Sequence, residues 1–313
     1  MQHRNILEQQ TGLPIATDVP LKHHTSFGIG GPAALYAEAD STRALSTLLR
    51  CADTLALEVL IIGGGTNLLV SDDGFDGLAI RLVLDKVTVD ENRARIRAEA
   101  GVSTSALVDL SVRHSLGGLT FAAGLPGTIG GGIAGNAGCF GRCLGDALLE
   151  ATLVSRAGEI IRISDTGWFD FEYRHSKLLR SGHVITEALY QLAPTSSKTL
   201  EADAQKNVEL RHRKHPAKGM RTAGSYFKNL PPKEPGGRRL AAGMFLDRAG
   251  VKGLSVRDAK VFEKHANIIV NTGGASAEDV LTLAATMQRR VRDKFGIRLE
   301  PEVRFIGPRP DGL

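Results

Sequence analysis

Apolar residues recur along the chain at two spacings, and each spacing predicts one kind of element. Residues three or four positions apart are apolar in 41–51, 103–114 and 276–295, which is typical of one face of an amphipathic helix. A polar helix followed by a linker is expected within 196–217, and a further helix at 241–249. Short apolar or alternating runs predict strands at 59–62, 68–70, 78–82, 94–100, 151–155, 160–163, 183–192, 268–270 and 298–306.

The helix predicted at 276–295 has the clearest start and stop signals in the chain. Ser276 can cap its first turn, and Glu278 and Asp279 suit the positive N-terminal end of a helix dipole. Gly296 follows the last apolar position and is expected to end the helix. Together with the strands on either side, this helix predicts an α+β or α/β arrangement for the last third of the chain.

Glycine dominates the stretch 117–141, where ten of 25 residues are glycine. This density argues against an ordinary helix or strand, because an interior glycine costs roughly 0.5–1 kcal/mol relative to alanine. Apolar residues such as Phe121 and Ile133 argue against a disordered linker. Successive amides in tight turns form concave anion sites, so a phosphate site is one interpretation. A set of glycine turns stacked for packing alone is the other.

A second glycine turn follows the strand predicted at 59–62. It reads Gly63-Gly64-Gly65-Thr66-Asn67, and it is either a phosphate-binding turn or a plain tight turn. Two such turns about 60 residues apart favour a large diphosphate ligand. Neither matches the glycine pattern of a Rossmann dehydrogenase or of a P-loop enzyme, so both classes are disfavoured. The passage 22–32 is also turn-rich and contains three glycines.

Composition limits the class of protein. A chain of 313 residues can form two or three domains, and it contains no run of eighteen apolar residues. The N-terminus lacks the pattern of a secretory signal, so we expect a cytoplasmic protein without membrane insertion. Cys51, Cys139 and Cys143 are expected to be reduced thiols. We expect no metal site, because no histidine or further cysteine lies near the last two.

Charge suggests the kind of ligand. The net charge of +5 arises from 39 basic and 34 acidic residues, with basic clusters at 211–214 and 289–294. This weak excess suits an anionic small molecule. Aromatic residues make up only 5% and no nucleic-acid motif is present, so we expect no nucleic-acid partner. The sequence indicates no oligomeric state.

Six motifs, taken in order, resemble the UDP-N-acetylenolpyruvoylglucosamine reductases, also called UDP-N-acetylmuramate dehydrogenases. They read IIGGGTNLLVSDDGFDGLAIRL, GLTFAAGLPGTIGGGIAGNAGCFG, YRHS, AGSYFKN, FEKHANIIVN and LEPEVRFIG, within residues 21–307. The resemblance implies an α+β fold. Its parts are an FAD-binding fold of the vanillyl-alcohol oxidase type, made of two α/β lobes, and a C-terminal α+β substrate-binding domain. The expected domains are 1–82, 83–215 and 216–313. The spacing between YRHS and AGSYFKN resembles the short type of the family, without a tyrosine-bearing insertion.

The family resemblance also implies a reaction. It is the NADPH-dependent reduction of UDP-N-acetylglucosamine enolpyruvate to UDP-N-acetylmuramate, with non-covalent FAD, in peptidoglycan and cell-wall synthesis. Cell shape, cell cycle and cell division depend on that synthesis. Two other interpretations stay open. One is an FAD-linked oxidase of the same fold that acts on another sugar or alcohol, and the other is a flavin- or nucleotide-binding module without catalysis.

The resemblance assigns individual residues to three roles. The catalytic residues would be Arg174, Ser225 and Glu302, and the substrate-binding residues would be Lys228, Asn229, His265 and Asn267. The FAD-binding residues would be Gly63, Gly64, Gly65, Thr66, Asn67, Leu68, Ala122, Ala123, Gly124, Pro126, Gly127, Thr128, Gly130, Gly131, Asn136, Ala137 and Gly138. The sequence departs from the family pattern at Leu230, where proline is usual, at Phe262, where serine is common, and at Ala134-Gly135, which is smaller than usual.

The implied chemistry calls for these residue types. Hydride added to the methylene carbon of an enol ether leaves negative charge on the adjacent carbon and its carboxylate. Arg174 would supply a positive charge there, and Glu302, if protonated, a hydrogen bond. Ser225 would deliver the proton to the adjacent carbon as general acid.

Overall fold

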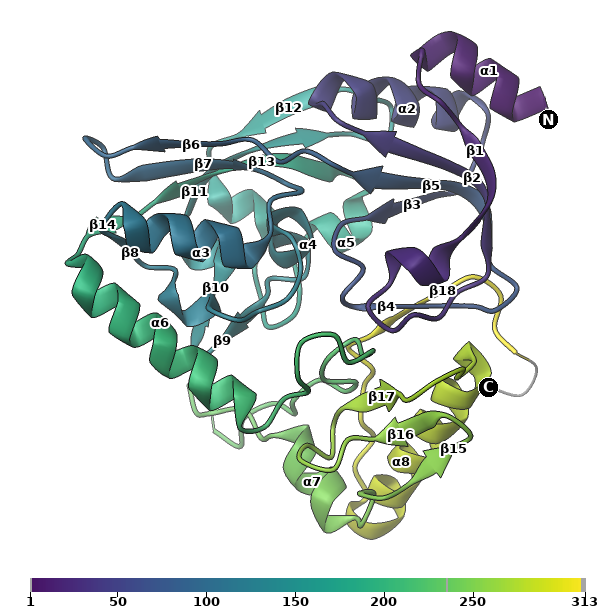
Figure 1. Ribbon diagram of the computed structural model, residues 1–313, viewed down its shortest axis with the longest axis vertical. Coiled ribbons are helices and arrows are strands. Elements are labelled where there is room, and N and C mark those ends of the chain that lie inside the picture. Colours follow the sequence, from purple (N-terminus) through teal and green to yellow (C-terminus); the bar gives the residue numbers. More distant parts are fainter. Residues whose placement is uncertain (1, 235, 311–313) are drawn as a thin grey trace. The chain divides into compact units, whose positions relative to one another are not determined.

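The computed structural model describes residues 2–234 and 236–310, and these form two compact units (Figure 1). Unit 1 contains Met1–Asp18, Ala34–Gly64 and Gly77–Arg211, and unit 2 contains Val19–Ala33, Gly65–Asp76 and His212–Leu313. Each unit is therefore assembled from three separate segments of the chain. The boundaries that we expect for three domains, 1–82, 83–215 and 216–313, stay a prediction.

The first sheet has four strands in the order β1 (Ala16–Pro20), β2 (Pro32–Ala39), β5 (Phe75–Leu82) and β3 (Val59–Ile62). Strand β3 runs parallel to β5 and ends directly before the first glycine turn. Helix α2 (Thr42–Thr54) buries Leu45 and Leu48 in the core beside this sheet, and the side chain of Ser41 caps its N-terminus at 3.2 Å from the amide of Ala44. Helix α1 (Gln2–Thr11) packs against α2.

The second sheet lies in unit 1 and has five antiparallel strands. Their order is β12 (Ile160–Ile163), β11 (Leu148–Val154), β13 (Val184–Gln191), β7 (Arg95–Glu99) and β6 (Val87–Asp90). The helices α3 (Thr104–Arg113), α4 (Ile129–Ala134) and α6 (Ser197–His212) lie on one side of it (Figure 1). Ile96, Leu107, Ile133 and Leu153 belong to its buried core. Smaller elements complete the unit, namely β8 (Leu116–Gly117), β14 (Ala193–Pro194), β9 (Gly138–Cys139), β10 (Arg142–Cys143) and α5 (Leu178–Ser181), with 3-10 turns at Thr120–Ala122, Leu144–Ala147 and Thr166–Phe169.

Unit 2 is built on a three-stranded antiparallel sheet in the order β15 (Ser255–Val256), β16 (Ala259–Val261) and β17 (Ile269–Asn271). Helices α7 (Ala242–Arg248) and α8 (Ala277–Phe295) contact each other and share one hydrophobic core with the sheet. Strand β4 (Leu68–Val70) pairs in parallel with β18 (Arg304–Ile306), and a 3-10 turn spans Leu21–His24.

Helix α8 has the ends that its sequence predicts. The hydroxyl of Ser276 accepts a hydrogen bond from the amide of Asp279, and the carboxylate of Asp279 accepts one from the amide of Ser276, each at 3.0 Å. Gly296 adopts the left-handed conformation, with φ 68°, directly after the helix. This reciprocal cap satisfies two amides that would otherwise lack a partner.

The expectation that the glycine-rich stretch excludes a helix is wrong, because α4 lies inside it. The hydroxyl of Thr128 caps the helix, and its glycines permit close packing. A Cβ on Gly130 would lie 2.8 Å from the Cβ of Ala100, and one on Gly132 would lie 2.4 Å from a methyl group of Leu144. The low helix propensity of glycine is thus offset by tertiary contacts that no larger residue would allow.

The strand expected at 298–306 is shorter than predicted. Only Arg304–Ile306 forms a strand, whereas Pro301, which has no amide to donate, pairs with Phe227 in an isolated bridge. Among the described residues, the sequence patterns also did not indicate the elements α1, α5, β1, β2, β6, β8, β9, β10, β14, β15 and β16.

Candidate active site

The first glycine turn meets the second glycine-rich segment inside unit 1. A Cβ on Gly64 would lie 3.0 Å from the Cα of Gly127, and a Cβ on Gly63 would lie 2.5 Å from the hydroxyl oxygen of Thr128. At Gly64 backbone therefore faces backbone, and a side chain there would press the two segments apart, whereas a side chain on Gly63 would displace the hydroxyl of Thr128.

The same turn offers amide donors. Among the described residues, the amides of Gly64, Gly65 and Thr66 donate no hydrogen bond. Gly65 has φ +61°, a conformation that residues with a Cβ rarely adopt. Three successive amides of this kind suit the oxygens of a phosphate group, so the turn fits the diphosphate of FAD.

The second cofactor segment, residues 122–138, also has polar groups that could form hydrogen bonds with a ligand. A Cβ on Gly131 would contact only the hydroxyl of Thr128, at 3.6 Å, so this glycine borders open space. Asn136 is buried with φ +43°, and its amide nitrogen donates to the carbonyl of Glu172 at 2.9 Å. Its side-chain oxygen is buried without a partner among the described residues. A buried unpaired acceptor is typical of a position where a ligand or water supplies the donor.

The other predicted cofactor residues lie in or next to these two segments. Ala122 and Ala123 are buried at the end of a 3-10 turn, Gly124 and Pro126 are exposed, Gly130 is buried in α4, and Ala137 and Gly138 lead into β9. Leu68 begins β4 in unit 2. The unit 1 residues of these two segments therefore fit a flavin dinucleotide. The division of the chain into the two units falls within the first turn, after Gly64.

Arg174 lies in unit 1, in the loop that precedes α5. One guanidinium nitrogen donates to the carbonyl of Gly138 at 3.1 Å, and the guanidinium carbon lies 5.1 Å from the centre of the Tyr173 ring. The residue has φ +55°, which is strained for a side chain of this size. Arg174 is thus held at the end of the second cofactor segment.

Unit 2 brings Asn67, Ser225 and Glu302 together. Ser225 pairs with Ile268 in an isolated bridge, and the carbonyl of the next residue, Tyr226, accepts a hydrogen bond from the amide of Glu302 at 2.7 Å. The side-chain amide of Asn67 donates to the carbonyl of Glu302 at 3.1 Å. Two predicted catalytic residues and one predicted cofactor residue thus share one backbone network.

The predicted substrate-binding residues line this segment. Asn267 is buried, and its side chain both accepts from the amide of Phe227 at 2.9 Å and donates to its carbonyl at 2.8 Å. The amine of Lys228 lies 3.8 Å from the carboxylate of Glu300. The side-chain oxygen of Asn229 accepts from the amide of Ala242 at 3.1 Å, at the start of α7.

His265 is the predicted substrate residue with an altered pKa. Burial lowers the pKa of the imidazole, and the charge of Lys214 lowers it further. Its Nδ1 accepts from the amide of Asn267 at 3.2 Å, and its ring lies 5.4 Å from that of His215. The neutral imidazole is therefore favoured at this position.

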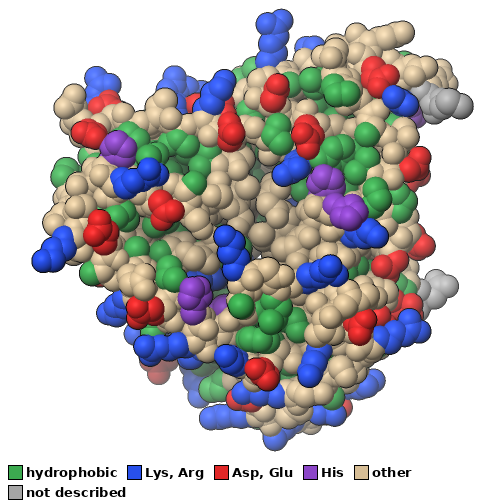
Figure 2. Space-filling view, viewed as in Figure 1, with side chains coloured by type: hydrophobic (Ala, Val, Ile, Leu, Met, Phe, Trp, Pro, Cys, Tyr) green, Lys and Arg blue, Asp and Glu red, His purple; other side chains and the backbone are tan. Residues whose placement is uncertain are grey.

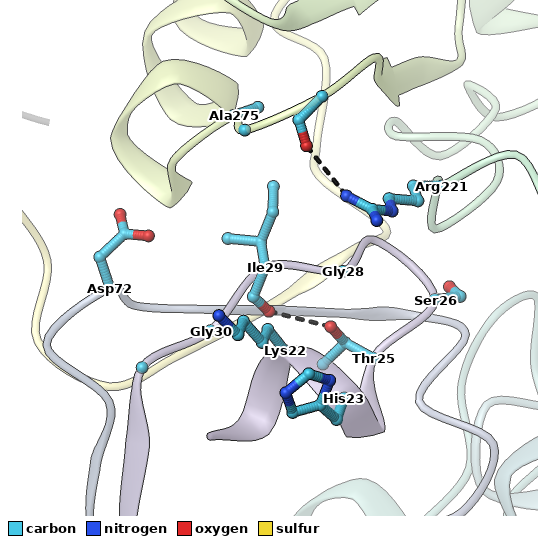
Figure 3. Close-up of a pocket in the computed structure, with 13 residues that line it drawn as sticks. Lys22, His23, Thr25, Ser26, Gly28, Ile29, Gly30, Asp72, Arg221 and Ala275 are labelled. Atoms are coloured by element: carbon cyan, nitrogen blue, oxygen red, sulfur yellow. Dashed lines mark hydrogen bonds between the residues drawn. The ribbon is translucent and has the colours of Figure 1, made fainter.

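The turn-rich passage 22–32, for which the sequence pattern indicates no function, lies around a cavity of about 570 Å³ in unit 2 (Figure 3). Lys22, His23, Asp72 and Arg221 line this cavity. Arg221 donates to the carbonyl of Gly273 at 2.9 Å, and the carboxylate of Asp72 accepts from the amide of Ala277 at 2.7 Å. Both groups thus stabilise loops of unit 2.

The described residues contain no group of three or more possible metal ligands and no helix long and apolar enough to cross a membrane. Basic and acidic side chains are interspersed over the face shown in Figure 2. The absence of a nucleic-acid partner stays a prediction.

Two family models match the chain. The model described as FAD binding domain matches residues 33–164, and the model described as UDP-N-acetylenolpyruvoylglucosamine reductase, C-terminal domain, matches residues 215–306. The predicted fold class is therefore confirmed, with an FAD-binding fold of the vanillyl-alcohol oxidase type and a C-terminal domain after it.

Relatives match along nearly the whole chain. UDP-N-acetylenolpyruvoylglucosamine reductase 2 of Symbiobacterium thermophilum is 40% identical over 93% of this chain and 92% of its own length. The reductase of Agathobacter rectalis is 37% identical over 97% of this chain and 98% of its own length. A crystal structure of the UDP-N-acetylenolpyruvylglucosamine reductase of Thermus caldophilus superimposes with a TM-score of 0.77 at 29% identity, covering 94% of this chain and 99% of that one. The chain therefore belongs to the UDP-N-acetylenolpyruvoylglucosamine reductase family.

Proposed function

We propose that this protein is an FAD-dependent oxidoreductase that reduces UDP-N-acetylglucosamine enolpyruvate to UDP-N-acetylmuramate, with NADPH as reductant, in peptidoglycan precursor synthesis. The observation that carries this proposal is the similarity to reductases of that name over more than nine-tenths of both chains. The free amides of the first glycine turn support it, because they suit a diphosphate. A place in the cytoplasm is part of the proposal.

FAD would be held by the turn at residues 63–68 and by the segment 122–138, and when bound it would accept hydride from NADPH and pass it to the substrate. The residues of these two segments would orient the flavin and exclude water from it. The close contact between Gly64 and Gly127 fixes the distance between the two binding segments. The buried side-chain oxygen of Asn136 would accept a hydrogen bond from a donor of the ligand or from a water.

Three side chains would act on the substrate. The guanidinium of Arg174 would stabilise the negative charge that develops on the enolpyruvyl carboxylate and the carbon beside it. A protonated Glu302 would donate a hydrogen bond to the same region. The hydroxyl of Ser225 would give its proton to that carbon, so that one hydride and one proton add across the double bond. Lys228, Asn229, His265 and Asn267 would shape the substrate lobe.

The backbone around Ser225 supports a precise position for its hydroxyl. Gly224 has φ +76°, Ser225 pairs with Ile268, and the side chain of Asn267 binds both backbone groups of Phe227. The segment is therefore constrained on both sides of the serine, which limits the motion of a group that must meet one carbon atom.

A spectrum of the purified protein followed by mixing experiments tests the proposal. We expect a yellow protein whose FAD is released by denaturation, and whose visible absorbance is bleached by NADPH and restored by UDP-N-acetylglucosamine enolpyruvate without oxygen. A colourless protein that takes up no FAD would overturn the proposal. Restoration by oxygen alone, without any NADPH-dependent turnover of the enolpyruvyl substrate, would favour an oxidase of the same fold.

A further inference from the structure

Helix α6 reaches the second cofactor segment with two polar side chains one turn apart. The side-chain amide of Asn207 donates to the carbonyl of Thr120 at 3.0 Å, and the Nε of Arg211 donates to the carbonyl of Gly124 at 3.1 Å. Gly124 has φ +74°, and a Cβ there would lie 3.3 Å from the Cδ of Arg211. The arginine therefore lies directly against this glycine.

The guanidinium of Arg211 also lies near the other end of the same segment. Burial raises the pKa of the Cys139 thiol, and the charge of Arg211 lowers it again in part. The thiol itself donates to the carbonyl of Phe121 at 2.8 Å. The residue before Cys139 is Gly138, whose carbonyl accepts from Arg174 at 3.1 Å. Arg211 thus lies close to a second guanidinium, because burial and then the charge of Arg174 lower the pKa of Arg211.

No carboxylate in the part of the chain that the structure describes is paired with Arg211. Among the described residues Arg211 forms no ion pair, whereas the nearby Arg142 lies 3.2 Å from the carboxylate of Asp146. A guanidinium carries five N–H donors, and the carbonyl of Gly124 uses only one of them. Holding a partly buried cation beside a second cation is unfavourable unless an anion compensates it.

We propose that Arg211 binds an anionic oxygen of the ligand at this site and so positions the ligand against residues 124–139. The inference rests on the proposed function, which supplies two ligands of this chemistry. FAD carries a diphosphate, and UDP-N-acetylglucosamine enolpyruvate carries a diphosphate and a carboxylate. A purely structural role would make Arg211 equivalent to Asn207, which ties the same segment to α6 without a charge.

The test compares Arg211→Gln with two controls. Asn207→Ala removes the neutral link to the same segment, and Arg213→Gln removes an exposed charge two residues away. For each, FAD is titrated into the apoprotein with fluorescence quenching as the readout, and UDP-N-acetylglucosamine enolpyruvate is titrated into the FAD-loaded protein with the visible spectrum as the readout. The melting temperature of each apoprotein is also measured.

We expect Arg211→Gln to lower the affinity for one of the two ligands by about 10- to 100-fold, as for the loss of a charge-assisted hydrogen bond. Its apoprotein should melt no lower than that of Asn207→Ala. Arg211→Lys should recover part of the affinity, and the controls should bind within about threefold of the wild type. The affected titration identifies the source of the anion.

Two results would overturn the inference, and they are distinguishable. If the wild type binds both ligands and Arg211→Gln binds them as tightly as Asn207→Ala does, Arg211 is only a link to α6 and the proposed function stands. If the wild type binds neither FAD nor the enolpyruvyl substrate, the proposed function fails and this inference fails with it.

Discussion

Ser225 is positioned by the backbone of its neighbours. The bridge to Ile268 and the hydrogen bond between Tyr226 and Glu302 hold the segment from two sides. A substitution that removes only the hydroxyl should therefore leave this network intact. The chemical role of the serine can be separated from its structural surroundings for this reason.

We expect Ser225→Ala to leave the bleaching of FAD absorbance by NADPH nearly unchanged. The restoration of absorbance by the enolpyruvyl substrate should slow by about 10²- to 10⁴-fold, as for the loss of a general acid. Stopped-flow absorbance follows the two steps separately, and Ser225→Cys should recover part of the loss because a thiol is more acidic. An equal slowing of both steps would show that Ser225 shapes the lobe or positions NADPH.

Arg174→Lys should reduce turnover at least about tenfold although the charge is conserved, because an ammonium group cannot reproduce the planar fork of a guanidinium. It also loses the contact geometry with the carbonyl of Gly138 and with the Tyr173 ring. Steady-state rates with saturating NADPH measure the effect. Rates equal to those of the wild type would remove Arg174 from the reaction.

The side-chain roles could not have been found from residue patterns alone. Nothing in the spacing of Arg174, Ser225 and Glu302 indicates that they act together, and only the family resemblance assigned them. Arg211 was visible in the sequence merely as part of a basic cluster. Its contact with Gly124 depends on the packing of α6, which no local pattern encodes.

Helices and strands with a local signal were predicted well. The caps of α8 and the bounds of β3, β4 and β12 agree with the sequence pattern, because each has its apolar residues and its end signal within a few positions. The sequence pattern did not predict helix α4, because the reason for its glycines is not local. Ala100 and Leu144, which lie outside the helix, leave no room for a larger side chain at these positions.

Gly131→Leu tests why glycine occurs at an open position of α4. The protein offers room for a Cβ there, and leucine is the better helix former, so the melting temperature of the apoprotein should stay close to that of the wild type. The same side chain should occupy the space beside the flavin and abolish FAD binding. Gly131→Ala is the graded control. Full FAD occupancy in Gly131→Leu would place the ligand elsewhere.

Ser276→Ala should lower the free energy of unfolding by about 0.5–2 kcal/mol, since it removes the N-terminal cap of the longest helix in unit 2. Urea denaturation followed by circular dichroism measures this difference. Thr47→Ala, which removes a hydroxyl from the exposed middle of α2, serves as the control and should cost little. Equal effects of the two substitutions would contradict the importance of the cap.

At the level of the whole molecule, the sequence predicted two glycine turns that bind one large ligand, but not the way in which the chain divides. Segments of the two compact units alternate along the sequence, and one boundary between them falls within the first turn. Contacts between segments far apart in the sequence decide such a division. Local composition indicated only where the linkers and turns lie.

FAD should stabilise the native protein by mass action, because the unfolded chain cannot present the two glycine segments together. At a free FAD concentration of 100 times the dissociation constant, the gain in the free energy of unfolding should be about 2.7 kcal/mol. Thermal melts over a series of FAD concentrations measure it. A melting temperature that is independent of FAD would contradict binding at a site formed only by folding.

The alternation of the segments of the two units along the sequence also constrains the order in which the chain can fold during synthesis. Phe27, Ile29 and Leu69 are buried in a core whose other members come from residues 223–303. These side chains leave the ribosome long before their packing partners are made. The nascent chain must therefore carry them exposed, or held by a chaperone, until its last third has been translated.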